Sequence, residues 1–149
     1  MKALIVYDSV YGNTEKIARA IAEAITPSGE VKVLGVDEAS PSELASIDLL
    51  VVGSPTHGGR PTPAVQGLIN KVPKLQGINV AAFDTRSQAK LARVFGNAAG
   101  RIARNLKGKG GVLIAPPEGF FVTGTKGPLK EGELERAAGW AKAILESRK

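Results

Sequence analysis

Residue types that build metal and disulfide redox sites are scarce in this chain of 149 residues. There is no cysteine, which excludes disulfides, thiolate metal ligands and a cysteine nucleophile. There is one histidine, which argues against a zinc or iron site. Any redox chemistry must therefore come from an organic cofactor.

Long apolar segments are missing as well. No apolar run approaches the roughly 20 residues of a membrane-spanning helix, and the start of the chain, Met1-Lys2 followed by strand-like residues, does not read as a signal peptide. We therefore expect a cytoplasmic protein with no membrane contact. The length is that of a single domain over residues 1–149.

The charge balance is basic and aromatic residues are few. The net charge of +6 favours anionic partners without naming one. Aromatic residues are 5% of the chain and do not interleave with the basic ones, so we expect no nucleic acid partner.

Short apolar segments alternate with helical patterns along the chain. The expected strands are Ala3–Tyr7, Val31–Val36, Leu49–Gly53, Asn79–Phe83 and Gly111–Ala115. The expected helices are Thr14–Ile25, Pro63–Val72, Lys90–Leu106 and Gly132–Ser147, with a short turn near Pro41–Ile47. Continuous apolar strands separated by helices predict a parallel sheet covered on both faces. We expect an α/β, doubly wound sheet of order 2-1-3-4-5, with its ligand crevice at the carboxyl ends of strands 1 and 3.

The loop between the first strand and the first helix is rich in hydroxyl and amide groups. It comprises Ser9, Val10, Tyr11, Gly12, Asn13 and Thr14. A helix N-terminus offers free N–H groups and partial positive charge, so this loop predicts an anion site, with phosphate as the usual occupant. The loop has no lysine and only one glycine, which argues against a nucleoside triphosphate and against NAD. The alternative is that Asn13 or Thr14 is an ordinary helix cap.

Two further loops should converge on the first one. The second follows Gly53 and contains Pro55, Thr56, His57, Gly58 and Gly59. Its glycines allow backbone N–H groups to turn toward a ligand, and His57 offers a flat ring to stack on a flat cofactor, or is a solvated loop residue. The third, with Asp84, Thr85, Arg86 and Ser87, is polar and follows an apolar strand, as a binding loop or a helix cap would.

These loops resemble those of the flavodoxins, a family of FMN-binding electron carriers. Ser9 to Thr14 resembles the flavodoxin phosphate loop, with Tyr11 at the position where threonine is usual. The Tyr11-Gly12 pair and the segment Gly53 to His57 are closer to the flavodoxin-like domain of A-type flavodiiron proteins, and also resemble quinone reductases of the WrbA type.

The resemblance implies a role for each loop. The first would hold the FMN phosphate, the second would border the flavin ring, and the third, Asp84, Thr85 and Arg86, would border its pyrimidine edge. It also implies an electron carrier that serves redox partner proteins. The alternatives are an FMN-dependent NAD(P)H:quinone reductase and a binding module that has lost its flavin.

The chain departs from the family pattern in ways that bear on its partners. Flavodoxins are generally acidic, many carry an aromatic residue in the third loop, and flavodiiron proteins add a diiron domain that these residues do not contain. Between Thr85 and Lys109 there are seven basic residues and no acidic one. On a helix, Lys90, Arg93, Arg101 and Arg104 share one side, which is either a solvated face or a docking surface for acidic partner proteins.

Two aromatic features lie near the end of the chain. Phe120 and Phe121 follow the last expected strand and read as core or lid packing, or as an apolar contact surface. Trp140 reads as a core residue of the last helix.

Overall fold

The apolar segments form one parallel sheet. The computed structural model describes residues 1–44, 46–88 and 96–148. Within them the strands are β1 (Lys2–Tyr7), β2 (Glu30–Gly35), β3 (Leu49–Pro55), β4 (Asn79–Ser87), β5 (Val112–Leu113) and β6 (Glu118–Val122). The strand order is β2-β1-β3-β4-β5, β6 also pairs with β4, and every pair is parallel. The expected doubly wound sheet is thereby confirmed.

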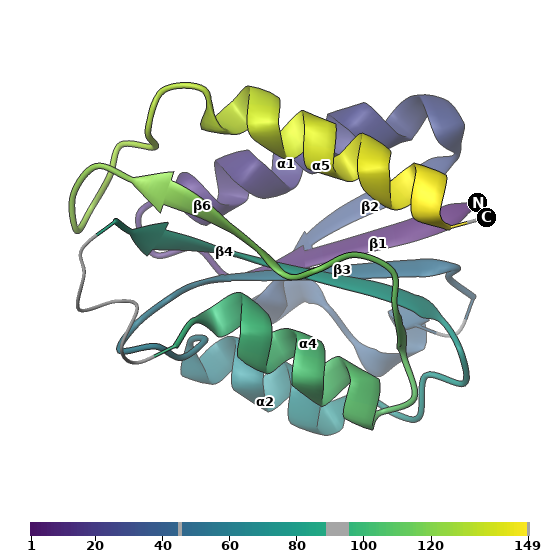
Figure 1. Ribbon diagram of the computed structural model, residues 1–149. Coiled ribbons are helices and arrows are strands. Elements are labelled where there is room, and N and C mark those ends of the chain that lie inside the picture. Colours follow the sequence, from purple (N-terminus) through teal and green to yellow (C-terminus); the bar gives the residue numbers. More distant parts are fainter. Residues whose placement is uncertain (45, 89–95, 149) are drawn as a thin grey trace.

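Helices cover both faces of the sheet (Figure 1). Helices α1 (Asn13–Ile25) and α5 (Glu133–Ser147) lie side by side on one face, and α2 (Pro63–Lys71) and α4 (Ala98–Gly108) cover the other. Short 3₁₀ helices are η1 (Thr26–Ser28), η2 (Val36–Glu38) and η3 (Pro41–Leu44). None of the helices in the described ranges is long and apolar enough to cross a membrane.

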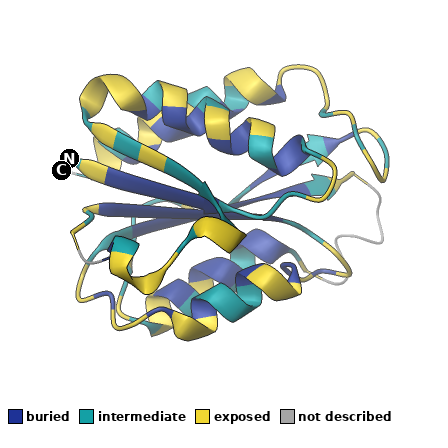
Figure 2. Cartoon of the chain, turned by 180° about the vertical axis from the view of Figure 1, so that it is seen from behind, coloured by how far each residue is buried: buried dark blue, intermediate teal, exposed yellow. Residues whose placement is uncertain are grey.

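Strand side chains alternate between two apolar layers. Ile5, Val51 and Phe83 point toward α1 and α5, whereas their neighbours Leu4 and Val52 point toward α2 and α4. Because successive strand residues face opposite sides, a strand covered on both faces is apolar throughout. Figure 2 shows the result: buried strands between helices whose outer faces are exposed. The polar loops at the strand ends are thus held on a rigid frame.

The expected fifth strand, Gly111–Ala115, was wrong in its extent. Only Val112–Leu113 pairs with β4, and β6 then takes the same side of β4 further along. Pro116 and Pro117 separate the two pieces, because proline has no N–H to donate to a sheet ladder. Pairing with β6 also extends β4 to Ser87, so the strand does not end at Phe83 as expected.

The aromatic side chains near the end of the chain mostly belong to the core. Phe120 of β6 is fully buried, and its ring meets Phe83 and Trp140 edge to face. This confirms core packing for Phe120 and for Trp140. Phe121 is half-buried on the opposite side of the strand.

Helix α4 begins at Ala98, later than the expected start at Lys90. Gly96 has a φ of 82°, and the Asn97 side chain accepts a hydrogen bond from Gly100 N, so the helix is capped there. Lys90 and Arg93 lie outside the described residues. The described helix packs on the sheet through Ala98, Ile102 and Leu106, which are buried.

Candidate functional site

The first loop places unpaired backbone donors at the start of α1. Gly12 takes a φ of 91° before the helix, and the Ser9 hydroxyl accepts hydrogen bonds from Gly12 N (3.1 Å) and Glu15 N (3.3 Å). No acceptor in the described part of the chain pairs with the backbone N–H of Asn13 or Thr14. These two donors and the positive end of the helix favour an anion.

The second loop is a tight turn. His57 and Arg60 exchange backbone hydrogen bonds of 2.9 and 3.1 Å, with Gly58 and Gly59 between them at φ values of 59° and 79°. Positive φ at both central positions is costly for residues with a side chain, which explains the glycine pair. The Arg101 side chain donates to the Gly59 carbonyl at 3.0 Å and so ties the turn to α4.

The third segment is the end of β4 rather than a loop, which corrects the expectation for Asp84 to Ser87. The Thr85 hydroxyl lies 2.8 Å from the hydroxyl of Thr14 and so joins β4 to the first loop. Thr85 also accepts a backbone hydrogen bond from Thr56 N at 2.9 Å. Asp84 is fully buried and accepts from the Arg86 guanidinium and from Ala99 N.

A further segment, residues 122–128, closes on the first loop. The Asn13 side chain donates to the Lys126 carbonyl at 3.1 Å, and the Lys126 ammonium lies 6.0 Å from the centre of the Tyr11 ring. Gly127 packs so closely on Asn13 that a Cβ there would meet its amide. Residues 122–128 were not among the predicted site residues, although the Gly124-Thr125 pair, placed after an apolar strand, has the same character as the first loop.

Together these segments enclose a cavity of about 340 Å³. In the described part of the chain its lining residues are Val10, Tyr11, Asn13, Thr14, Pro55, Thr56, His57, Thr85, Arg86, Ser87, Val122, Gly124 and Thr125. The first nine are predicted site residues. Ser9, Gly12, Gly58, Gly59 and Asp84 were also predicted but are not on this lining: they shape the loops and the strand end behind it.

The chemistry of the lining suits an anionic organic ligand with a flat part. None of the described lining residues is acidic, and the volume falls in the range of small-molecule sites. Hydroxyls and free N–H groups gather at Thr14, whereas Pro55 and His57 offer flat surfaces at the other loop. A phosphorylated ring compound such as FMN fits this distribution.

Comparison with protein families decides the assignment. The flavodoxin family model matches residues 5–140. The chain belongs to the flavodoxin family. Members of this family bind FMN, and this chain is an FMN-binding member. The resemblance and the cofactor expected from the loops are confirmed.

The relatives of this flavodoxin family member include proteins of similar length and much longer ones. A flavodoxin from an archaeon superposes with a TM-score of 0.83 at 23% identity, over 99% of each chain. The rubredoxin oxygen:oxidoreductase of Desulfovibrio gigas superposes with a TM-score of 0.81 at 27% identity, over 99% of this chain and 36% of that one. The diflavin flavoprotein A 5 of Nostoc sp. is 40% identical over 99 residues, which are 62% of this chain and 15% of its own. The chain thus spans about 15% of the length of the first curated relatives.

Proposed function

We propose that the cavity is the FMN site and that the protein carries electrons between redox enzymes. The observation that carries the site is the distribution of groups along the cavity: unpaired N–H donors and hydroxyls at one end, flat surfaces at the other, and no acidic residue on the described lining. FMN has the same polarity, with a phosphate at one end and a flat ring system at the other. Bound FMN supplies one- and two-electron transfer chemistry.

The phosphate end of the proposed site is the start of α1. The N–H groups of Asn13 and Thr14 and the helix dipole would hold the negative charge. Ser9 keeps the turn in shape through Gly12 N and Glu15 N, and its hydroxyl can still donate to an anion. Neutral donors of this kind hold a phosphate without a metal ion.

The ring end lies between the second loop and the end of β4. Pro55, Thr56 and His57 would border one side of the ring, and Thr85 to Ser87 its edge. Val122, Gly124 and Thr125 would form a further wall in place of the aromatic residue that many flavodoxins carry in the third loop. Such packing orients the ring and excludes water from it.

An exposed rim supports a carrier that meets partner proteins. Val10 and Tyr11 line the cavity and are nonetheless 51% and 48% exposed, and His57 is exposed as well. Large apolar side chains at the mouth of a site are typical of contact surfaces. A partner docked on them would bring its own redox centre close to the flavin.

The partners proposed are redox proteins with acidic surfaces. Residues 8–14, 55–62 and 122–130 surround the cavity and contain Arg60, Lys126 and Lys130 against one acidic residue, Asp8. These three cations are exposed. Complementary charge of this kind speeds association and selects partners more than it adds affinity.

The test separates a carrier from a quinone reductase. FMN-loaded protein, reduced with dithionite, should pass electrons to ferricyanide, but NAD(P)H and a benzoquinone should give no turnover above that of free FMN. Quinone turnover that saturates with NAD(P)H would overturn the carrier proposal in favour of the reductase. A protein that remains colourless after unbound FMN has been removed would be a binding module instead.

A further inference from the structure

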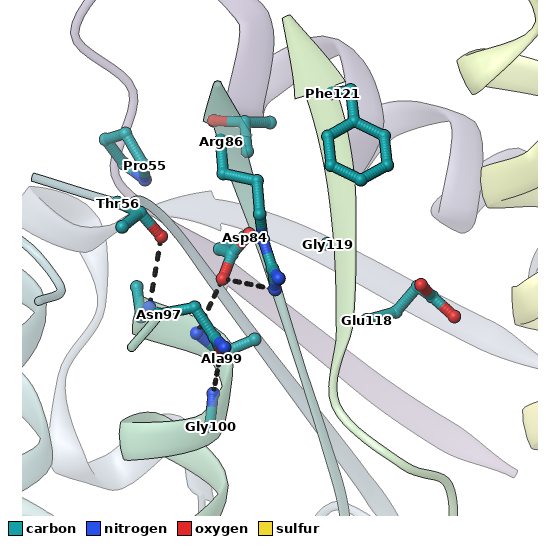
Figure 3. A network of polar contacts seen from close by, with 12 residues as sticks. Pro55, Thr56, Asp84, Arg86, Asn97, Ala99, Gly100, Glu118, Gly119 and Phe121 are labelled. Carbon is teal, nitrogen blue, oxygen red and sulfur yellow. Dashed lines mark hydrogen bonds and ion pairs between the residues drawn. The ribbon is translucent and has the colours of Figure 1, made fainter. Parts of the chain in front are cut away.

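An ion pair between the buried Asp84 and Arg86 forms part of the cavity wall. Asp84 is 0% exposed, and its two oxygens accept from Arg86 Nε at 2.7 Å and Arg86 Nη2 at 2.9 Å. One of these oxygens also accepts from Ala99 N in the first turn of α4, at 2.9 Å. Figure 3 shows the Arg86 side chain turned back along the strand toward Asp84. Arg86 is therefore a paired cation, although it lines the cavity.

The neighbouring strand β6 leaves room for the Arg86 side chain. Gly119 of β6 pairs with Asp84, and a Cβ at Gly119 would collide with the Arg86 guanidinium. The missing side chain thus leaves a slot in which the guanidinium lies (Figure 3). With two bonds to one carboxylate and 24% of its side chain exposed, Arg86 is fixed in place.

We propose that Asp84 is a positioning residue that sets the charge this wall presents to the flavin. It holds Arg86 in the slot of Gly119 and cancels its positive charge. The fully reduced flavin carries one more negative charge than the oxidised flavin, so a free guanidinium would favour the reduced form. The ion pair of Asp84 and Arg86 keeps the preference for the reduced flavin small. This inference rests on the FMN site proposed above.

A charge cycle tests the inference. The dissociation constants of oxidised and dithionite-reduced FMN are measured for the wild type, Asp84→Asn, Arg86→Gln and the double variant. Relative to the wild type, Asp84→Asn should favour reduced over oxidised FMN by about tenfold, and Arg86→Gln should disfavour it by a similar factor. The double variant should stay within about threefold of the wild type, because both charges are gone.

Two controls keep the outcome clear. Glu43→Gln removes a carboxylate that pairs with Lys32 at 2.9 Å beside the opposite, amino-terminal end of the sheet, and should leave the ratio unchanged. Arg86→Lys keeps the charge and loses the two-bond geometry. If Asp84→Asn does not fold, two results together support the inference. The ratio of the affinities for reduced and oxidised FMN should stay near the wild-type value in Arg86→Lys and should fall in Arg86→Gln.

The contrary results are equally definite. If Asp84→Asn and Arg86→Gln shift the ratio in the same direction, or leave it unchanged while lowering the unfolding midpoint, the pair is purely structural. A wild type that binds no FMN overturns the proposed site and this inference together. If the wild type binds FMN but the substitutions leave the ratio of the affinities for reduced and oxidised FMN unchanged, only the inference is overturned.

Discussion

Single side chains near the cavity either shape a loop or face the ligand. The Thr56 hydroxyl accepts from Ala98 N at 3.0 Å and so helps to cap α4, although Thr56 also lines the cavity. Ser9 caps the turn before α1. His57 has only backbone partners in the described part of the chain, so its exposed imidazole is available to a ligand. Residue type alone does not separate these roles, since each of these side chains is polar and lies in a loop.

The prediction at this scale concerns His57. Replacing His57 by Ala should weaken FMN binding and change the visible spectrum of the bound flavin, because the imidazole would no longer lie beside the ring. Arg60→Gln, in the same turn but off the lining, is the control and should leave the spectrum unchanged. Absorption titration measures both. A His57→Ala protein with unaltered affinity and spectrum would identify His57 as a solvated loop residue.

Among the elements, β6 depends on α5. Glu133 accepts from Phe121 N at 2.7 Å, and Arg136 binds Glu133, Glu118 at 3.0 Å and the carbonyl of Gly119. The side chains of α5 thus satisfy backbone groups at the edge of β6, beside the backbone pairing that residues 128–130 make with Phe121 and Thr123. Hydrogen bonds from Arg136 hold the pKa of Glu133 below its usual value, against the opposing effect of burial, and the Phe121 N–H lowers it further.

This clamp predicts a pH-dependent stability. Glu133→Gln should lower the free energy of unfolding at pH 7 by about 1–3 kcal/mol, because Arg136 loses a buried anionic partner. The charged Glu133 contributes its full effect above its unfolded-state pKa of 4.5, and the effect fades as pH falls through the lower folded-state pKa. Urea unfolding at pH 7 and at pH 3 measures the difference between variant and wild type. It should shrink at pH 3.

The matched control for this prediction is Glu135→Gln in the same turn of α5, where the side chain is exposed. It should have little effect at either pH. A Glu133→Gln penalty of the same size at both pH values would mean that the charge of Glu133 does not stabilise β6.

Most of the sheet and its covering helices could be predicted from the sequence, but the sheet edge formed by β5 and β6 could not. The order of β1, β3 and β4 follows from apolar runs separated by helices, and the two loops after β1 and β3 carry their own composition signals. The β5–β6 interruption was missed because Glu118 to Val122 reads as a loop beside two prolines. The part of the cavity wall that Val122, Gly124 and Thr125 form was missed for the same reason. The pairing of Asp84 with Arg86 depends on Gly119, a contact between strands that spacing along the chain does not reveal.

The net charge of the whole protein should govern how fast it reacts with charged oxidants. The net charge is +6, and the segments around the cavity are themselves basic. Reduced protein should therefore be reoxidised faster by the anion ferricyanide at low salt, with the rate falling as ionic strength rises. The cation hexaammineruthenium(III) should show the opposite salt dependence. Stopped-flow absorption measures both rates. Equal salt dependence for the two oxidants would contradict a basic surface at the flavin.

The measurement that most directly tests the central claim compares FMN with riboflavin, which lacks the phosphate. Apo-protein is titrated with each ligand for the wild type, for Ser9→Ala/Thr14→Ala, and for the exposed control Ser40→Ala/Ser42→Ala. The account predicts that the Ser9/Thr14 variant loses about 10- to 100-fold in affinity for FMN and much less for riboflavin, since charged hydrogen bonds are lost only with the phosphate. Equal losses for both ligands would contradict a phosphate site at the start of α1.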